Sequence, residues 1–125
     1  MLDYKQLKEL LWACHERFRY VGDMAKYDIP EYWPSFNDIP DVGIYEEDCD
    51  GFAQMVRKEL HKLGEESRLA LCGVNSNTIN HCVAIYDNYV LDNIHHFPMR
   101  KSELATYKWF TISGFTVDEP WREII

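Results

Sequence analysis

One short stretch, Glu47-Asp48-Cys49-Asp50-Gly51-Phe52-Ala53, constrains the fold of this chain more than any other. Asp48 is a residue type preferred at the N-cap of a helix, because its carboxylate can accept a hydrogen bond from a backbone amide of the first turn. Apolar residues then recur at helical spacing as far as Gly64, a residue typical of the end of a helix. The pattern predicts a helix that begins beside Cys49 and ends near Gly64.

Cys49 is therefore placed at the N-terminus of a helix. There, unpaired backbone N–H groups and the positive end of the helix dipole favour thiolate over thiol. The carboxylates of Asp48 and Asp50 oppose this effect, so activation of the sulfur requires a histidine. We expect Cys49 to be a catalytic nucleophile, although a cysteine that follows an N-cap residue is more often structural.

Size and charge narrow the class of protein. The chain has 125 residues, of which 46% are hydrophobic, and this predicts a single domain over residues 1–125. The formal net charge of −8 argues against nucleic acids and anionic membranes as partners, because both require clustered Lys and Arg. No run approaches the roughly 18 apolar residues of a membrane span. Residues 1–18 lack the apolar segment of a signal peptide, so a cytoplasmic location is expected.

The segments before Cys49 differ in character. Residues 3–19 carry a stripe of apolar side chains opposite charged ones, which predicts an amphipathic helix packed on the core. Residues 20–47 contain three prolines and many aromatic residues, which predicts a long ordered loop. Two interpretations of this loop remain open: it forms one wall of a cleft, or its aromatic side chains only cover the core.

The segments after the Cys49 helix are predicted to form strands. Residues 68–74 and 108–115 each have the composition of a strand, and residues 81–86 and 89–92 flank a short Asp-Asn turn. In such a hairpin, His81 and Asp92 occupy mirror positions about the turn. The sequence thus predicts that an imidazole and a carboxylate lie together.

Cysteine catalysis needs a base within hydrogen-bond reach of the sulfur and a third group that holds the other nitrogen of the base. Cys49, His81 and Asp92 meet this requirement if the helix start lies beside the hairpin. The backbone N–H of Cys49 would also face a developing oxyanion. Each of the three signals is weak alone, and their conjunction is what favours an enzyme.

These residues also carry a family resemblance. The runs Glu47-Asp-Cys-Asp-Gly-Phe-Ala53, His81-Cys-Val-Ala-Ile85 and Tyr89-Val-Leu-Asp-Asn93 resemble three boxes of the bacterial transglutaminase-like cysteine proteinases. The upstream Trp33 resembles the tryptophan that this family has ahead of its cysteine box. The chain departs from the usual Gly-Asp-Cys-Glu-Asp form of that box, because Glu47, Asp50 and Gly51 stand at three of its positions.

The resemblance implies a papain-like α+β fold, with N-terminal helices packed on an antiparallel sheet. It implies Cys49 as nucleophile, His81 as general base and then acid, Asp92 as the residue that orients His81, and Trp33 as part of the oxyanion hole. No cofactor is expected apart from calcium, for which the resemblance implies Asp48 and Asp50 as ligands. Calcium takes 6 to 8 oxygen ligands, so two carboxylates would be only part of such a site.

The expected activity is that of a cysteine peptidase or amidase acting on a protein or peptide, with hydrolysis favoured over transamidation. Three alternatives remain. The run Asp48-Cys-Asp-Gly-Phe52 also resembles the opening of cell-wall peptidases of the NlpC type. A catalytically inactive binding module with the same fold is a second alternative. A zinc site built from Cys49, Cys72, Cys82, His81, His95 and His96 is a third, although these residues lack the spacing of ligand pairs.

Overall fold

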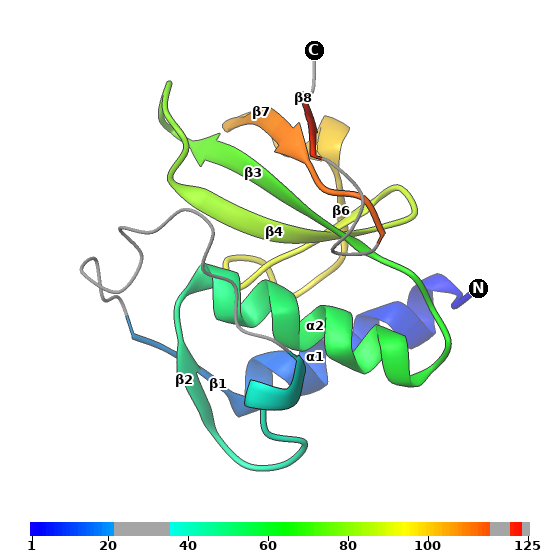
Figure 1. Cartoon of the computed structure of the whole chain (residues 1–125). Coiled ribbons are helices and arrows are strands. Elements are labelled where there is room, and N and C mark those ends of the chain that lie inside the picture. Colours follow the sequence, from blue (N-terminus) through cyan, green and yellow to red (C-terminus); the bar gives the residue numbers. More distant parts are fainter. Residues whose placement is uncertain (22–35, 116–120, 124–125) are drawn as a thin grey trace.

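The computed structural model describes residues 1–21, 36–115 and 121–123 of the chain. Two helices, α1 (Tyr4–Arg17) and α2 (Cys49–Lys62), lie together on one side of a largely antiparallel sheet (Figure 1). This is the predicted α+β class. Among the described residues, neither helix has the length and apolarity that a membrane crossing requires.

Helix α1 begins at a capping box. The Gln6 backbone N–H donates to the Asp3 carboxylate over 2.8 Å, and the Asp3 N–H donates to the Gln6 side chain over 3.0 Å. The predicted stripe is buried at Leu7, Leu11 and Cys14, which pack toward α2 in the main core. The helix ends two residues earlier than the stripe suggested, because Phe18 already begins a strand.

The predicted long loop contains regular structure. Strand β1 (Phe18–Tyr20) pairs in parallel with strand β2 (Tyr45–Glu47), and a short 3₁₀ helix covers Phe36–Asp38. The expectation of a long ordered loop over residues 20–47 was therefore wrong at its two ends, which lie in strands. Residues 22–35, and with them Trp33 and the middle of the predicted cleft wall, lie outside the described residues.

The main sheet has the strand order β6-β5-β4-β3-β7-β8, and every neighbouring pair is antiparallel. Strands β3 (Arg68–Val74) and β4 (His81–Tyr86) have the predicted bounds, and β5 (Tyr89–Leu91) ends one residue early. The strand predicted over residues 108–115 is β7 (Tyr107–Ile112). No local pattern predicts the two-residue strands β6 (Met99–Arg100) and β8 (Arg122–Glu123). A 3₁₀ turn covers Lys101–Glu103.

Alternation along β4 divides the core in two. Cys82, Ala84 and Tyr86 belong to the cluster that the helices cover, whereas Val83 and Ile85 pack in a second cluster on the opposite face of the sheet. Helix α2 runs along the covered face of β4 (Figure 1). This packing carries the N-terminus of α2 to the end of the sheet at which β4 starts.

Candidate active site

The start of helix α2 is fixed by Asp48. One oxygen of its carboxylate accepts the backbone N–H groups of Asp50, over 3.0 Å, and Gly51, over 3.4 Å. This is the predicted N-cap, and it makes Cys49 the first residue of the helix. Gly51 is needed here because an added Cβ would lie 1.9 Å from the Cγ atom of Glu47, whose side chain packs on the first turn.

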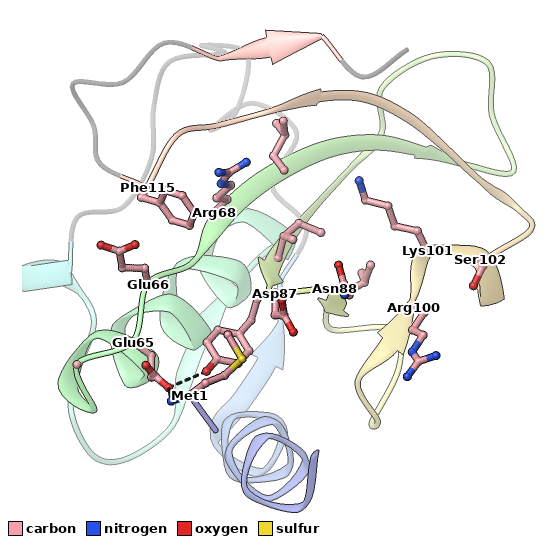
Figure 2. A pocket seen from close by; sticks show the side chains of 15 residues that line it. Met1, Glu65, Glu66, Arg68, Asp87, Asn88, Arg100, Lys101, Ser102 and Phe115 are labelled. Carbon is pink, nitrogen blue, oxygen red and sulfur yellow. Dashed lines mark hydrogen bonds and ion pairs between the residues drawn. The ribbon is translucent and has the colours of Figure 1, made fainter. Parts of the chain in front are cut away.

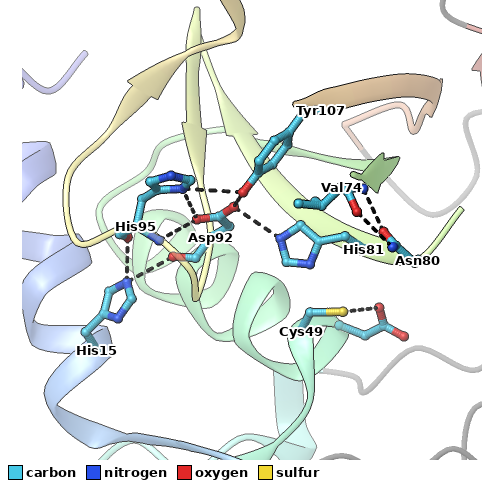
Figure 3. Close-up of polar contacts among 9 residues, drawn as sticks. His15, Cys49, Val74, Asn80, His81, Asp92, His95 and Tyr107 are labelled. Atoms are coloured by element: carbon cyan, nitrogen blue, oxygen red, sulfur yellow. Dashed lines mark hydrogen bonds and ion pairs between the residues drawn. The ribbon is translucent and has the colours of Figure 1, made fainter. Parts of the chain in front are cut away.

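Cys49 lines a small cavity at the N-terminus of this helix. The cavity has a volume of about 350 Å³, and His81 and Asn93 lie in its wall. Figure 3 shows the sulfur of Cys49 on the side of the His81 ring that faces away from Asp92. Cys49 is half-buried, whereas Cys14, Cys72 and Cys82 are buried. The cavity thus exposes one thiol beside one imidazole.

The surroundings of Cys49 favour the thiol over the thiolate. Burial, followed by the negative charges of Asp50 and Asp48, raises the pKa of Cys49, while a hydrogen bond from the Cys82 backbone acts in the opposite direction. The Cys49 sulfur lies 3.6 Å from Asp50 Oδ1. This agrees with the expectation that Asp48 and Asp50 oppose the effect of the helix N-terminus, so that activation of the sulfur requires a histidine. The carboxylates and burial outweigh the helix dipole.

His81 and Asp92 meet as the hairpin predicted. His81 Nε2 donates to Asp92 Oδ2 over 3.1 Å, and both side chains are buried. The register explains this contact: Ala84 pairs with Leu91, so Asp92 follows opposite Val83, on the same face as His81. The Asn80 side chain exchanges two hydrogen bonds with the backbone of Val74, of 2.8 and 3.1 Å, and so fixes the start of β4.

Asp92 is held by more groups than the sequence indicated. Its Oδ2 atom also accepts the hydroxyl of Tyr107 over 2.5 Å, and its Oδ1 atom accepts the backbone N–H of His95 over 2.9 Å. Burial alone would raise the pKa of Asp92. The hydrogen bonds from His81, Tyr107 and His95 outweigh burial and lower the pKa to about 2. Asp92 is therefore ionised at every pH at which the protein would work.

The loop after Asp92 is tied to helix α1 by a third histidine. His15 Nε2 lies 2.9 Å from the carbonyl oxygen of Asp92 and 2.8 Å from that of His95. Since both partners are acceptors, this nitrogen carries the proton. Burial lowers the pKa of His15, in keeping with a neutral ring. Sequence reasoning missed the roles of His15, His95 and Tyr107, because no local pattern links them to Asp92.

Asp48, Cys49 and Asp50 place one ligand atom each within 4.8 Å of one another. In the part of the chain that the structure describes, this is the only such group of acidic, cysteine and histidine side chains, so the zinc set considered above is not assembled. Two carboxylates suit calcium, but a thiol does not, and two amides already bind Asp48. The described residues can supply part of a calcium site.

A larger cavity, of about 1000 Å³, lies away from these residues. It is lined by charged side chains that include Glu65, Arg68 and Arg100 (Figure 2). None of the predicted site residues lines it, so the smaller cavity is the candidate active site.

The carboxyl group of Asp50 makes the stability of the protein depend on pH. Burial, and next the charge of Asp48, raise its pKa to about 6. Because the folded state binds the Asp50 proton more tightly than the unfolded state, stability falls as the pH rises from about 4 to 6. We expect Asp50→Asn, in EGTA, to raise the free energy of unfolding at pH 8 by about 1 kcal/mol, less than a fully buried charge would give. The variant should leave stability near pH 4 unchanged.

Urea unfolding of both proteins at the two pH values measures this difference. Asp87→Asn is the matched control, because Asp87 is exposed in the hairpin turn, where its φ of 54° is one that Asn also tolerates. An equal effect of Asp50→Asn at pH 4 and pH 8 would show that the ionised carboxylate of Asp50 does not destabilise the folded protein.

Comparisons with known proteins bear on the fold. No protein-family model and no curated protein matches the chain. The structure does resemble solved structures of Legionella pneumophila LapG. One, 21% identical, has a TM-score of 0.69 and covers 95% of this chain and 67% of LapG. An EGTA-treated form, 21% identical, has a TM-score of 0.72 with 97% and 67% covered, and a calcium-bound form, 20% identical, has a TM-score of 0.72 with 95% and 67% covered.

At this level of identity the likeness shows the fold. The chain has the transglutaminase-like fold, in agreement with the architecture that the sequence boxes implied.

Proposed function

We propose that this protein is a cysteine peptidase or amidase that hydrolyses an amide bond through a thioester on Cys49. The observation that carries the proposal is the arrangement in one cavity of a cysteine at a helix N-terminus and a histidine bound to a buried carboxylate. The fold agrees with it, since the transglutaminase-like fold is the one that the three sequence boxes carrying these residues implied. An inactive binding module would have no need of this arrangement.

The mechanism follows from which nitrogen of His81 is occupied. Asp92 is ionised and accepts a hydrogen bond from the protonated Nε2, which leaves Nδ1 of His81 as a base toward the cavity. His81 Nδ1 takes the Cys49 proton while the sulfur attacks the amide carbonyl carbon. Starting from a thiol suits this sequence of events, because proton transfer accompanies attack and no stable ion pair is required.

Collapse of the tetrahedral intermediate requires the same proton. The imidazolium of His81 gives it to the leaving amine, and the carbonyl remains on Cys49 as a thioester. A water molecule then loses a proton to His81 and attacks the thioester, which releases a carboxylic acid and restores the thiol. An amine in place of water would give transamidation at the same site, and hydrolysis is the proposal because water needs no second binding site.

Stabilisation of the oxyanion draws on the start of α2. The backbone N–H of Cys49 is among the first donors of the helix, which lack acceptors within it. A second donor from Trp33 is part of the proposal that follows from the family resemblance, and the described residues do not include it.

Calcium binding at Asp48 and Asp50 is part of the same proposal. A bound cation would neutralise the two carboxylates that raise the pKa of Cys49. The calcium-bound and EGTA-treated forms of LapG make calcium a reasonable ligand to test. Thermal unfolding detects calcium binding independently of activity.

We expect saturating calcium to raise the melting temperature of the EGTA-treated protein by about 10 °C, as expected for a ligand near a hundred times its dissociation constant. Asp50→Asn should abolish most of this increase, and Asp87→Asn should keep it. Differential scanning fluorimetry in calcium, magnesium and EGTA measures the three cases. An identical melting temperature in calcium and EGTA would remove calcium from the proposal.

The activity is tested by profiling new N-termini in a denatured proteome after incubation with the wild-type protein. Cys49→Ala is the matched control, because it removes the sulfur alone. New N-termini that depend on Cys49 would support a peptidase, whereas their absence, together with release of fragments from peptidoglycan peptides, would favour the cell-wall alternative. No Cys49-dependent product from either substrate would count against a hydrolase.

A further inference from the structure

One oxygen of Asp92 serves two donors. Oδ2 accepts His81 Nε2 over 3.1 Å and the Tyr107 hydroxyl over 2.5 Å, and the two donors come from different strands, β4 and β7 (Figure 3). Tyr107 is 8% exposed and Asp92 is 1% exposed, so water does not compete for these bonds. The orientation of the carboxylate toward His81 is thus shared with a tyrosine that does not line the cavity.

The position of Tyr107 is itself firmly held. Tyr107 pairs with Val74 across β7 and β3, and its backbone N–H donates to Leu104 over 3.1 Å. Its ring meets the His81 ring edge-on, with 5.8 Å between centroids and an interplanar angle of 82°. The residue therefore limits the movement of both members of the His81–Asp92 pair.

The proton of the hydroxyl can be assigned. Burial, and next Asp92, raise the pKa of Tyr107, so the hydroxyl keeps its proton and donates it. His95 Nδ1 lies 3.3 Å from the Tyr107 oxygen and 3.3 Å from Asp92 Oδ1, which makes it a donor to both. With the backbone N–H of His95, the donors to Asp92 match the lone pairs of an ionised carboxylate.

We propose that Tyr107 is a positioning residue that holds Asp92 Oδ2 in line with His81 Nε2 and so keeps Nδ1 of His81 aimed at the Cys49 sulfur. The inference rests on the proposed function, since the aim of His81 matters only if it is the base. Without the hydroxyl, Oδ2 loses one of its two donors, so the carboxylate is held less firmly and the direction of the His81 ring is less fixed.

The test removes the hydroxyl alone. Tyr107→Phe keeps the ring against His81, and Tyr86→Phe is the matched control. Tyr86 is equally buried, lies at the opposite end of β4 and donates its hydroxyl to the carboxylate of Glu65 over 2.7 Å. Both variants lose a tyrosine–carboxylate hydrogen bond, and only one loses it at Asp92.

Two readouts separate positioning from mere stability. The first is the rate at which iodoacetamide alkylates Cys49 at neutral pH. Loss of a hydrogen bond to a charged group changes a rate constant roughly tenfold or more. We therefore expect alkylation in Tyr107→Phe to be about ten times slower than in the wild type, and alkylation in Tyr86→Phe to proceed at the wild-type rate. The second is the exchange of the His81 Nε2 proton with water, observed by NMR in histidine-labelled protein, which should become faster only in Tyr107→Phe.

The outcomes are distinct. If wild-type Cys49 reacts faster than Cys49 in His81→Ala while Tyr107→Phe behaves like Tyr86→Phe in both readouts, the positioning role is wrong. If wild-type Cys49 reacts no faster than Cys49 in His81→Ala, the proposed function fails, and the proton-exchange readout still tests the link from Tyr107 to His81. If Tyr107→Phe does not fold, the wild-type spectrum decides: a cross-relaxation signal between the Tyr107 hydroxyl and His81 Nε2 protons supports the link, and a rapidly exchanging hydroxyl overturns it.

Discussion

Asp92→Asn is expected to lower the turnover of an amide substrate about a thousandfold with little change in KM. The side-chain amide has one oxygen and one NH₂ group, whereas Asp92 accepts donors at both of its oxygens. When the NH₂ group faces His81, it donates to Nε2, and the ring proton moves to Nδ1, the nitrogen that must take the Cys49 proton. The variant thus holds the base in the wrong tautomer.

A peptide taken from a Cys49-dependent cleavage site provides the substrate for this measurement. Asp87→Asn makes the same chemical change in an exposed turn and should retain wild-type turnover. Circular dichroism establishes whether Asp92→Asn is folded, since the loss of a buried charge partner also lowers stability. A folded Asp92→Asn protein with turnover within a few fold of wild type would exclude Asp92 from the mechanism.

His81→Ala is expected to slow the alkylation of Cys49 by about a hundredfold at neutral pH. Burial and the carboxylates of Asp50 and Asp48 raise the pKa of Cys49, so its reaction with iodoacetamide depends on a base that takes the proton. His81 lies in the wall of the same cavity. General-base assistance of roughly this size is what a positioned imidazole supplies.

Mass spectrometry of the Cys49 peptide at timed intervals gives the rate constant, in calcium and in EGTA. The matched control is His61→Ala, which removes an exposed imidazole from the far end of α2. If His81→Ala and His61→Ala react at the same rate in both buffers, the histidine does not activate the sulfur, and the proposed division of roles is wrong.

The sequence predicted the elements that carry their own local signal. The N-cap at Asp48, the apolar period of α2 and the glycine that follows it defined the helix, and alternation defined β3 and β4. The contact of His81 with Asp92 followed from the turn between β4 and β5, because a hairpin fixes its own register. Local rules were sufficient wherever the partners lie within one hairpin or one helix.

Contacts between distant segments could not be predicted in this way. Tyr107 and His15 reach Asp92 from β7 and from α1, and nothing in the residues near them marks the contact. Strands β1 and β2 have three residues each, too few to show a period, and they form only because they pair with each other.

The burial of the Cys49 sulfur was not predicted. The helix N-terminus was expected to favour the thiolate and the Asp48 and Asp50 carboxylates to oppose it, so that activation required a histidine. The structure adds burial and the short distance from the sulfur to Asp50, which together outweigh the dipole. The depth of burial is a property of the packed protein, and a sequence pattern does not contain it.

The most direct test of the account is the order in which the four cysteines of the native protein react with a limiting dose of iodoacetamide. Cys14, Cys72 and Cys82 are buried, and burial raises the pKa of each, whereas Cys49 lines a cavity with His81. Peptide mapping should find the label on Cys49 before any other cysteine. Equal labelling of all four thiols in the folded protein would contradict the claim that Cys49 is an activated nucleophile.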